Sequence, residues 1–94
     1  MERKRLTAEE LVEKLSEVNN WEETDSAIHR RFRFANFAES LAFVNKVGAI
    51  AEAQDHHPDI TFGWGYAEFS ITTHDAGGLT EKDFALAREI DRIN

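Results

Sequence analysis

Residues 59–74 read "DITFGWGYAEFSITTH", and this stretch decides the fold. Two runs of β-branched and aromatic residues lie on either side of Gly63 and Gly65, a pattern typical of two strands joined by a short turn. In the second run Ala67, Phe69 and Ile71 alternate with polar residues. A period of two predicts an antiparallel pair with one face on a core and the other toward solvent.

A second strand pair precedes it at residues 21–34, "WEETDSAIHRRFRF". The turn-forming residues 24–26 divide this segment. Period two places Ile28, Phe32 and Phe34 on one side of the second strand. The sequence therefore predicts four antiparallel strands in two hairpins.

Helical patterns occupy residues 6–20, 36–55 and 77–94. Each opens with a capping signal, in which a small polar residue is followed three positions later by an acid. The three pairs are Thr7 with Glu10, Asn36 with Glu39, and Thr80 with Asp83.

The middle helical segment is the longest and should be the main cover of the sheet. Its expected stripe is Phe37, Leu41, Val44, Gly48 and Ala51, widened by Phe43, Val47 and Ile50. The order α-β-β-α-β-β-α predicts an α+β fold, a four-stranded antiparallel sheet with three helices packed on one face. Such a sheet keeps two edges, and pairing an edge with a second chain would give a dimer.

Length and composition exclude several classes of protein. Ninety-four residues fit one domain, 1–94, whose pocket is shallow or completed by a second copy. A net charge of -7 argues against nucleic acid as a partner. Without cysteine there are no disulfides or thiolate sites. We see no secretory signal and no membrane-spanning run, so we expect a cytoplasmic protein without membrane contact.

The segment "EAQDHHPDI", residues 52–60, carries the most reactive side chains. Glu52 and His56 are four apart, so on one helix Glu52 would orient His56. The helix C-terminus also favours a charged imidazole there, which suits proton transfer near neutral pH. Pro58 stops the helix, and His57 points elsewhere. His74 closes the last strand, where functional groups are common.

Simpler interpretations stay open for the same residues. A histidine at a helix end is stabilising without any function. Asp83 is explained by helix capping, and Trp64 by packing at a turn. Glu52, His56 and His74 could instead form a two-histidine, one-carboxylate metal site.

Residues 52–84 taken together resemble the signature of the pterin-4a-carbinolamine dehydratases. The matching elements are Glu52, His56-His57-Pro58, Trp64, Thr73-His74, Gly78-Leu79-Thr80 and Asp83, in the family's order and spacing. Two positions depart from it: Trp64 stands where many members have tyrosine, and Lys82 where some have arginine. The flanking helices and the strand at Trp21 extend the likeness over nearly the whole chain.

The resemblance implies the same α+β fold, in dimers often paired into tetramers. It implies dehydration of 4a-hydroxytetrahydropterin to quinonoid dihydropterin, in recycling of tetrahydrobiopterin after aromatic amino-acid hydroxylation. The pterin is the substrate, and no metal or other cofactor is needed. A hydroxylase pathway would be the metabolic partner.

The resemblance also implies roles for individual side chains. His56 and His74 would be the acid–base pair, with the assignment of acid and base left open, and His57 would bind the pterin and assist. Asp83 would support His74 or cap its helix, and Trp64 and Thr73 would line the pocket. The supporting set is thus Glu52, Pro58, Trp64, Thr73 and Asp83. Two alternatives remain: a non-catalytic dimerisation or interaction protein of the same fold, and a His/Glu metalloprotein.

Overall fold

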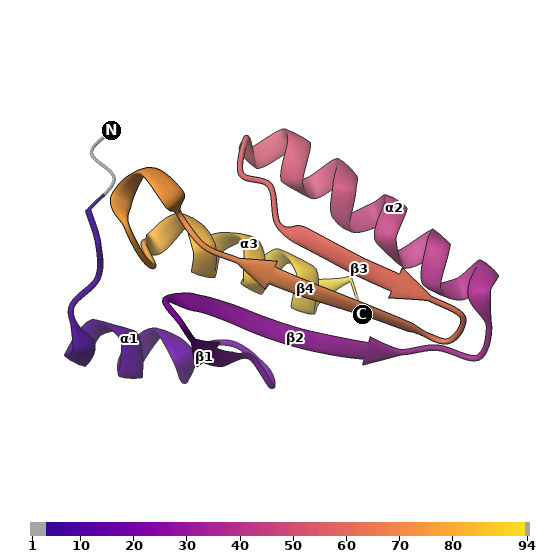
Figure 1. The fold of residues 1–94 in the computed structure, drawn as a ribbon, viewed down its shortest axis with the longest axis horizontal. Helices are drawn as coiled ribbons and strands as arrows, with labels where there is room; N and C mark the ends of the chain where they lie inside the picture. The colour runs from indigo at the N-terminus through magenta and orange to yellow at the C-terminus, as the bar shows by residue number, and fades with distance from the viewer. Residues whose placement is uncertain (1–3, 94) are drawn as a thin grey trace.

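The computed structural model describes residues 4–93 and contains three α-helices, four strands and one 3-10 helix. In chain order they are α1 (Ala8–Leu15), β1 (Glu22–Thr24), β2 (Ala27–Arg33), α2 (Phe37–Gln54), β3 (Asp59–Gly63), β4 (Tyr66–Ile71), η1 (His74–Ala76) and α3 (Glu81–Arg92) (Figure 1). The predicted order of elements is confirmed. Residues 1–3 and Asn94, the last residue of the predicted final helix, lie outside the described residues.

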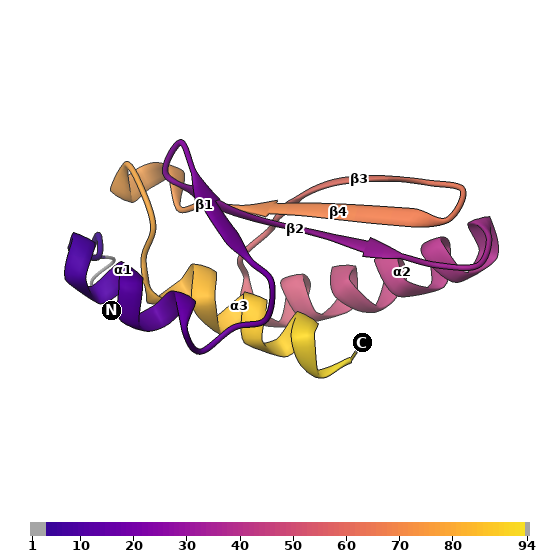
Figure 2. The ribbon, with the colours of Figure 1, turned by 90° about the horizontal axis from the view of Figure 1, so that it is seen from below.

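All four strands form one antiparallel sheet in the order β1-β2-β4-β3. The register pairs Ile28 with Ile71 and Phe62 with Ala67, so their side chains share one face. The three helices cover that face and leave the opposite one open (Figure 2). The predicted layered α+β arrangement is therefore confirmed. Among residues 4–93 no helix is long and apolar enough to span a bilayer.

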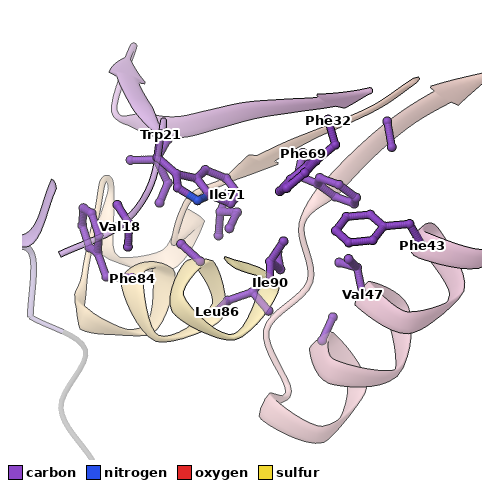
Figure 3. Close-up of a cluster of buried hydrophobic side chains, with 14 of the residues drawn as sticks. Val18, Trp21, Phe32, Phe43, Val47, Phe69, Ile71, Phe84, Leu86 and Ile90 are labelled. Carbon is purple, nitrogen blue, oxygen red and sulfur yellow. The ribbon is translucent and has the colours of Figure 1, made fainter. Parts of the chain in front are cut away.

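The core lies between the sheet and helices α2 and α3 (Figure 3). Phe43 of α2 packs on Phe32 and Phe69, with ring centroids 4.7 and 5.8 Å away. The buried side of α2 matches the predicted stripe only in part. It runs through Ser40, Phe43, Val47 and Ala51, whereas Phe37 and Leu41 are exposed. The reason is that α2 is apolar around most of its circumference, so its sequence pattern does not select one face.

Local polar groups set the ends of the helices as predicted. Thr7 and Glu10 form a reciprocal capping box at α1, with Glu10 Nα donating to Thr7 Oγ1 at 3.2 Å and Thr7 Nα donating to Glu10 Oε1 at 2.9 Å. Asn36 caps α2 by accepting from the backbone of Glu39. The hydrogen bond to the Thr7 amide lowers the pKa of the Glu10 carboxyl.

A salt-bridge cluster joins α1 to the start of α3. Lys14 Nζ lies 2.7 Å from Glu81, and Arg88 also contacts the Glu81 carboxylate. Partial burial opposes the charge on Glu81, but hydrogen bonds from Lys14 and Arg88 outweigh it and lower the pKa of the carboxyl. The cluster therefore helps to place α1 beside the end of α3 that holds the polar network described below.

Asp91 of α3 ties three segments together at the other end of that helix. Its carboxylate accepts hydrogen bonds from Asn19 Nα at 2.9 Å, Trp21 Nε1 at 2.8 Å and Arg30 Nη1 at 2.6 Å. The side chains of Arg30 and Asp91 are only 11% and 8% exposed. The Arg30 guanidinium also lies 4.0 Å from the Phe32 ring centroid. The Asp91 carboxylate thus neutralises the charge of the largely buried Arg30.

Replacing Asp91 with Ala should lower the free energy of unfolding by about 3–5 kcal/mol, because it leaves the buried Arg30 charge unpaired. Urea denaturation followed by circular dichroism measures this loss. Glu89→Ala is the matched control on the same helix, since the Glu89–Arg92 pair is exposed. Its expected cost is at most about 1 kcal/mol. Similar losses in both variants would contradict the role given to Asp91.

Candidate active site

His56 and Asp83 form a buried pair. His56 Nε2 lies 2.6 Å from Asp83 Oδ1, and the two side chains are 8% and 0% exposed. His56 belongs to the link between α2 and β3, whereas Asp83 stands in the first turn of α3. An imidazole and a carboxylate at this distance, withdrawn from water, make a charge-assisted hydrogen bond. Buried titratable pairs of this kind are typical of sites that move protons.

The second oxygen of Asp83 is also engaged. Oδ2 accepts from Thr73 Oγ1 at 2.9 Å and from Thr80 Nα at 2.8 Å. Thr73 Oγ1 lies 2.9 Å from Thr80 Oγ1, and Lys82 Nα donates to Thr80 Oγ1 at 3.2 Å. Thr73 and Thr80 are 1% and 2% exposed. We call His56, Asp83, Thr73 and Thr80 the Asp83 network.

The start of α3 explains why a carboxylate can be buried there. Thr80 and Asp83 form the predicted capping box, and Leu79 and Phe84 on either side are both buried. The positive end of the helix dipole favours an anion at this position. The expectation that Asp83 caps its helix is confirmed. Of the two roles expected for Asp83, this is therefore the one it has, and the hydrogen-bond partners of its two oxygens are His56, Thr73 and Thr80 rather than His74.

Asp55 changes the direction of the chain before His56. Asp55 adopts the left-handed conformation, with φ 52° and ψ 44°, and His56 Nα donates to Ala51 O at 3.1 Å. This ends α2 at Gln54, so His56 is not on the same helix face as Glu52. The predicted orientation of His56 by Glu52 is therefore wrong. His56 turns instead toward the N-terminus of α3.

His57 takes the partner that had been expected for His56. Its Nε2 contacts Oε2 of Glu52, in a pair whose side chains are 55% and 77% exposed. Two adjacent histidines thus have two different carboxylate partners, one buried and one at the surface. Pro58 is half-buried between His57 and the first residue of β3, where it prevents a return to helix.

His74 lies at the surface in η1, not at the end of a strand as predicted. β4 ends at Ile71, and the loop is closed by Thr73 and Gly78, whose backbones exchange hydrogen bonds of 3.3 and 3.4 Å. His74 follows Thr73 directly, so its backbone is one residue from the Asp83 network. No trio of described His, Asp or Glu side chains is arranged to hold a metal ion, which includes Glu52, His56 and His74.

The two residues predicted to line the pocket lie in different parts of the structure. Thr73 is interior, and its hydroxyl is used within the Asp83 network. Trp64 is 72% exposed in the turn between β3 and β4. The length of β3 separates this turn from His57, and five residues at about 3.3 Å each span roughly 17 Å. The expectation that Trp64 lines a pocket beside the histidines is therefore wrong within one chain, whereas Thr73 lies behind His56 on the same carboxylate.

A hollow of about 290 Å³ lies on the open face of the sheet. Its lining includes His29, Arg31, Glu68 and Ser70, and none of His56, His57 or His74 takes part. The hollow mixes acidic and basic groups, and its Arg31–Glu68 pair is half-exposed. We place the candidate active site at the histidines because paired, partly buried titratable groups carry proton chemistry, which a shallow polar surface does not.

Comparison with known proteins assigns the chain to a family. Residues 4–93 match the family described as pterin 4 alpha carbinolamine dehydratase. The chain belongs to this family. A protein of Rubrobacter xylanophilus, named as a candidate pterin-4-alpha-carbinolamine dehydratase, is 51% identical over 94% of this chain and 83% of its own length. A relative from Picosynechococcus with the same name is 49% identical over 95% of this chain and 97% of its own.

Solved structures agree with this membership of the pterin carbinolamine dehydratase family. A transcriptional coactivator/pterin dehydratase from Brucella melitensis superposes with a TM-score of 0.90 and 33% identity over 95% of this chain and 97% of that one. A pterin dehydratase-like RuBisCO assembly factor of the alpha-carboxysome has a TM-score of 0.64 and 24% identity, over 78% of this chain and 84% of its own. The second likeness concerns the fold alone.

The Asp83→Ala variant should lose at least about 2–4 kcal/mol of unfolding free energy, since it leaves buried donors of Thr73, Thr80 and His56 without an acceptor. Chemical denaturation provides the measurement. Glu52→Ala is the matched control, because it removes the exposed carboxylate partner of the neighbouring histidine. Its expected change stays within about 0.5 kcal/mol. A loss as large as that of Asp83→Ala would contradict the contrast between a structural buried pair and a dispensable exposed one.

Proposed function

We propose that this protein dehydrates a 4a-hydroxytetrahydropterin to quinonoid dihydropterin by histidine acid–base catalysis. The observation that carries the proposal is the buried His56–Asp83 pair in a chain of this family, with His57 adjacent and His74 one residue beyond Thr73. The substrate is then a small flat heterocycle, and the supplying reaction is the hydroxylation of an aromatic amino acid.

The reaction needs one proton donor and one proton acceptor. The bond from C4a to the hydroxyl breaks, N5 loses its proton, and a C4a–N5 double bond forms as water leaves. The pterin is neither oxidised nor reduced, so the step requires no metal or organic cofactor. An acid that protonates the leaving hydroxyl and a base that takes the N5 proton each contribute typically 10²–10⁴-fold, or roughly 3–5 kcal/mol of barrier.

His56 and His74 are the proposed acid–base pair, and His57 binds the pterin. Asp83 holds His56 in place, and Glu52 holds His57. The orientation of the buried His56 is fixed, whereas His57 and His74 are exposed and accessible to a ligand from solvent. Pro58 keeps the chain from returning to helix after His56 and His57, whose rings turn toward different carboxylates.

His56→Ala and His74→Ala should each slow dehydration by about 10²–10⁴-fold, because each removes one proton-transfer group. Stopped-flow absorbance of carbinolamine decay measures the rate, and circular dichroism checks the fold. His29→Ala is the matched control, since His29 lies on the open sheet face away from the other three histidines. Its rate should equal that of the unmodified protein.

Near-normal turnover in both His56→Ala and His74→Ala would overturn the assignment. Loss of wild-type activity on chelation would favour a metalloprotein instead. A protein that decays the carbinolamine only at the background rate, yet captures a stable partner in pull-down, would be an interaction module of the same fold.

We also propose that the chain forms homodimers or homotetramers. Phe37 and Leu41 of α2 are 45% and 39% exposed, and β1 and β3 are the edges of the sheet. Apolar side chains on one helix, with open sheet edges, suit contact with a second copy of the chain. In such an assembly, residues of a second copy would help to enclose a site that is shallow in the monomer.

Leu41→Glu should shift the molar mass toward that of the monomer, because it places a charge in the apolar surface of α2. Light scattering after size-exclusion chromatography measures the mass. Lys46→Glu, also exposed on α2 but about 140° around the helix from Leu41 at 100° per residue, is the control and should leave the mass unchanged. An unaltered mass for Leu41→Glu would exclude this surface as the contact.

A further inference from the structure

The hydrogen bonds of the Asp83 network all run in one direction. Backbone amides can only donate. The amide of Lys82 donates to Thr80 Oγ1 at 3.2 Å, and the amide of Thr80 donates to Asp83 Oδ2 at 2.8 Å. Thr73 gives its single hydroxyl proton to Asp83 Oδ2. The 2.9 Å bond between the two hydroxyls must therefore use the proton of Thr80.

This direction leaves Asp83 with one role toward His56. Two donors occupy Oδ2, and the N-terminus of α3 favours the ionised carboxylate. An ionised carboxylate only accepts, so Oδ1 accepts from His56 and the proton of the pair resides on Nε2 of the ring. The backbone and hydroxyl donors of two threonines on Oδ2 are thus consistent with a His56 ring protonated on Nε2.

The other ring nitrogen, Nδ1, is the one left for a ligand. No buried side-chain nitrogen or oxygen of the described residues lacks a hydrogen-bond partner, and within residues 4–93 no group bonds to Nδ1 of His56. Nδ1 therefore reaches the surface at the small exposed part of this side chain. In the neutral ring Nδ1 carries the lone pair, and in the charged ring it carries a proton that it can donate.

We propose that Thr73 and Thr80 are positioning residues that fix the proton of neutral His56 on Nε2 and make Nδ1 the nitrogen that exchanges a proton with the substrate. The part that concerns the substrate rests on the proposed dehydratase function. The part that concerns the tautomer rests on the geometry of the Asp83 network alone. One proton moves between Nδ1 and the pterin, while the Nε2 proton stays on the ring and the carboxylate stays ionised.

Asp83→Asn tests the direction of the network. Thr73 and Thr80 both donate to the Oδ2 position, which must therefore hold the amide oxygen of Asn. The amide nitrogen must then face His56. Nε2 of His56 then becomes an acceptor, and the neutral ring carries its proton on Nδ1. Tautomers of the ¹⁵N-labelled ring are distinguished by long-range ¹H–¹⁵N correlation spectra at a pH where histidine is neutral. We expect the Nε2–H form in the unmodified protein and the Nδ1–H form in Asp83→Asn.

Activity should follow the tautomer. The wrong tautomer is expected to lower kcat by on the order of 10⁴-fold, as it does where an Asp-to-Asn change inverts a reacting histidine. Thr73→Val should lower kcat by on the order of tenfold. Thr73→Ser, which keeps the hydroxyl, should have the kcat of the unmodified protein. Glu52→Gln, which alters the partner of His57, is the control and should leave the His56 spectrum unchanged.

The outcomes separate this inference from the proposed function. An Nδ1–H ring in the unmodified protein, or an unchanged ring in Asp83→Asn, overturns the inference. The expected inversion in a protein without dehydratase activity supports the positioning role and rejects the function. If Asp83→Asn fails to fold, two other measurements test the inference. They are the tautomer of the unmodified protein and the comparison of kcat between Thr73→Val and Thr73→Ser.

Discussion

The structure depends on one buried carboxylate. Asp83 is fully inaccessible to solvent, yet three separate segments of the chain converge on it. It closes the first turn of α3, fastens the loop that follows β4 through Thr73, and holds the ring of His56. A buried charge is tolerable only when donors surround it, and here the dipole of α3 adds to them. Stability and candidate chemistry therefore rest on the same group.

What could be predicted from the sequence was mostly local. The hairpin around Gly63 and Gly65 and the capping boxes at Thr7 and Thr80 depend on neighbours within a few residues, and all were found. The order of elements followed from them, and so did the layered fold. The histidines were identified as candidates by residue type and by resemblance to a family. Their partners were not, because contact across 27 residues is a tertiary property that spacing does not encode.

The errors have specific physical causes. Helical spacing paired Glu52 with His56, but left-handed Asp55 ends the helix before the second residue is reached. Aspartate is among the non-glycine residues that tolerate the left-handed region best, so a helix end at Asp55 was open to prediction, but helical spacing alone takes no account of it. Trp64 was placed beside the histidines by its position in a motif, although strand geometry carries it to the far end of β3. The predicted buried face of α2 was too wide and centred on exposed Phe37 and Leu41, because apolar residues surround that helix.

The left-handed residue at the end of α2 has a consequence for the link as a whole. Asp55 rotates the chain so that two consecutive imidazoles face different acids, one inside the protein and one outside it. The number of residues between α2 and β3 is therefore constrained more tightly than their chemical nature. Deleting one residue before His56 would carry His57 into the inward position, whereas inserting one would carry His56 into the solvent-facing position.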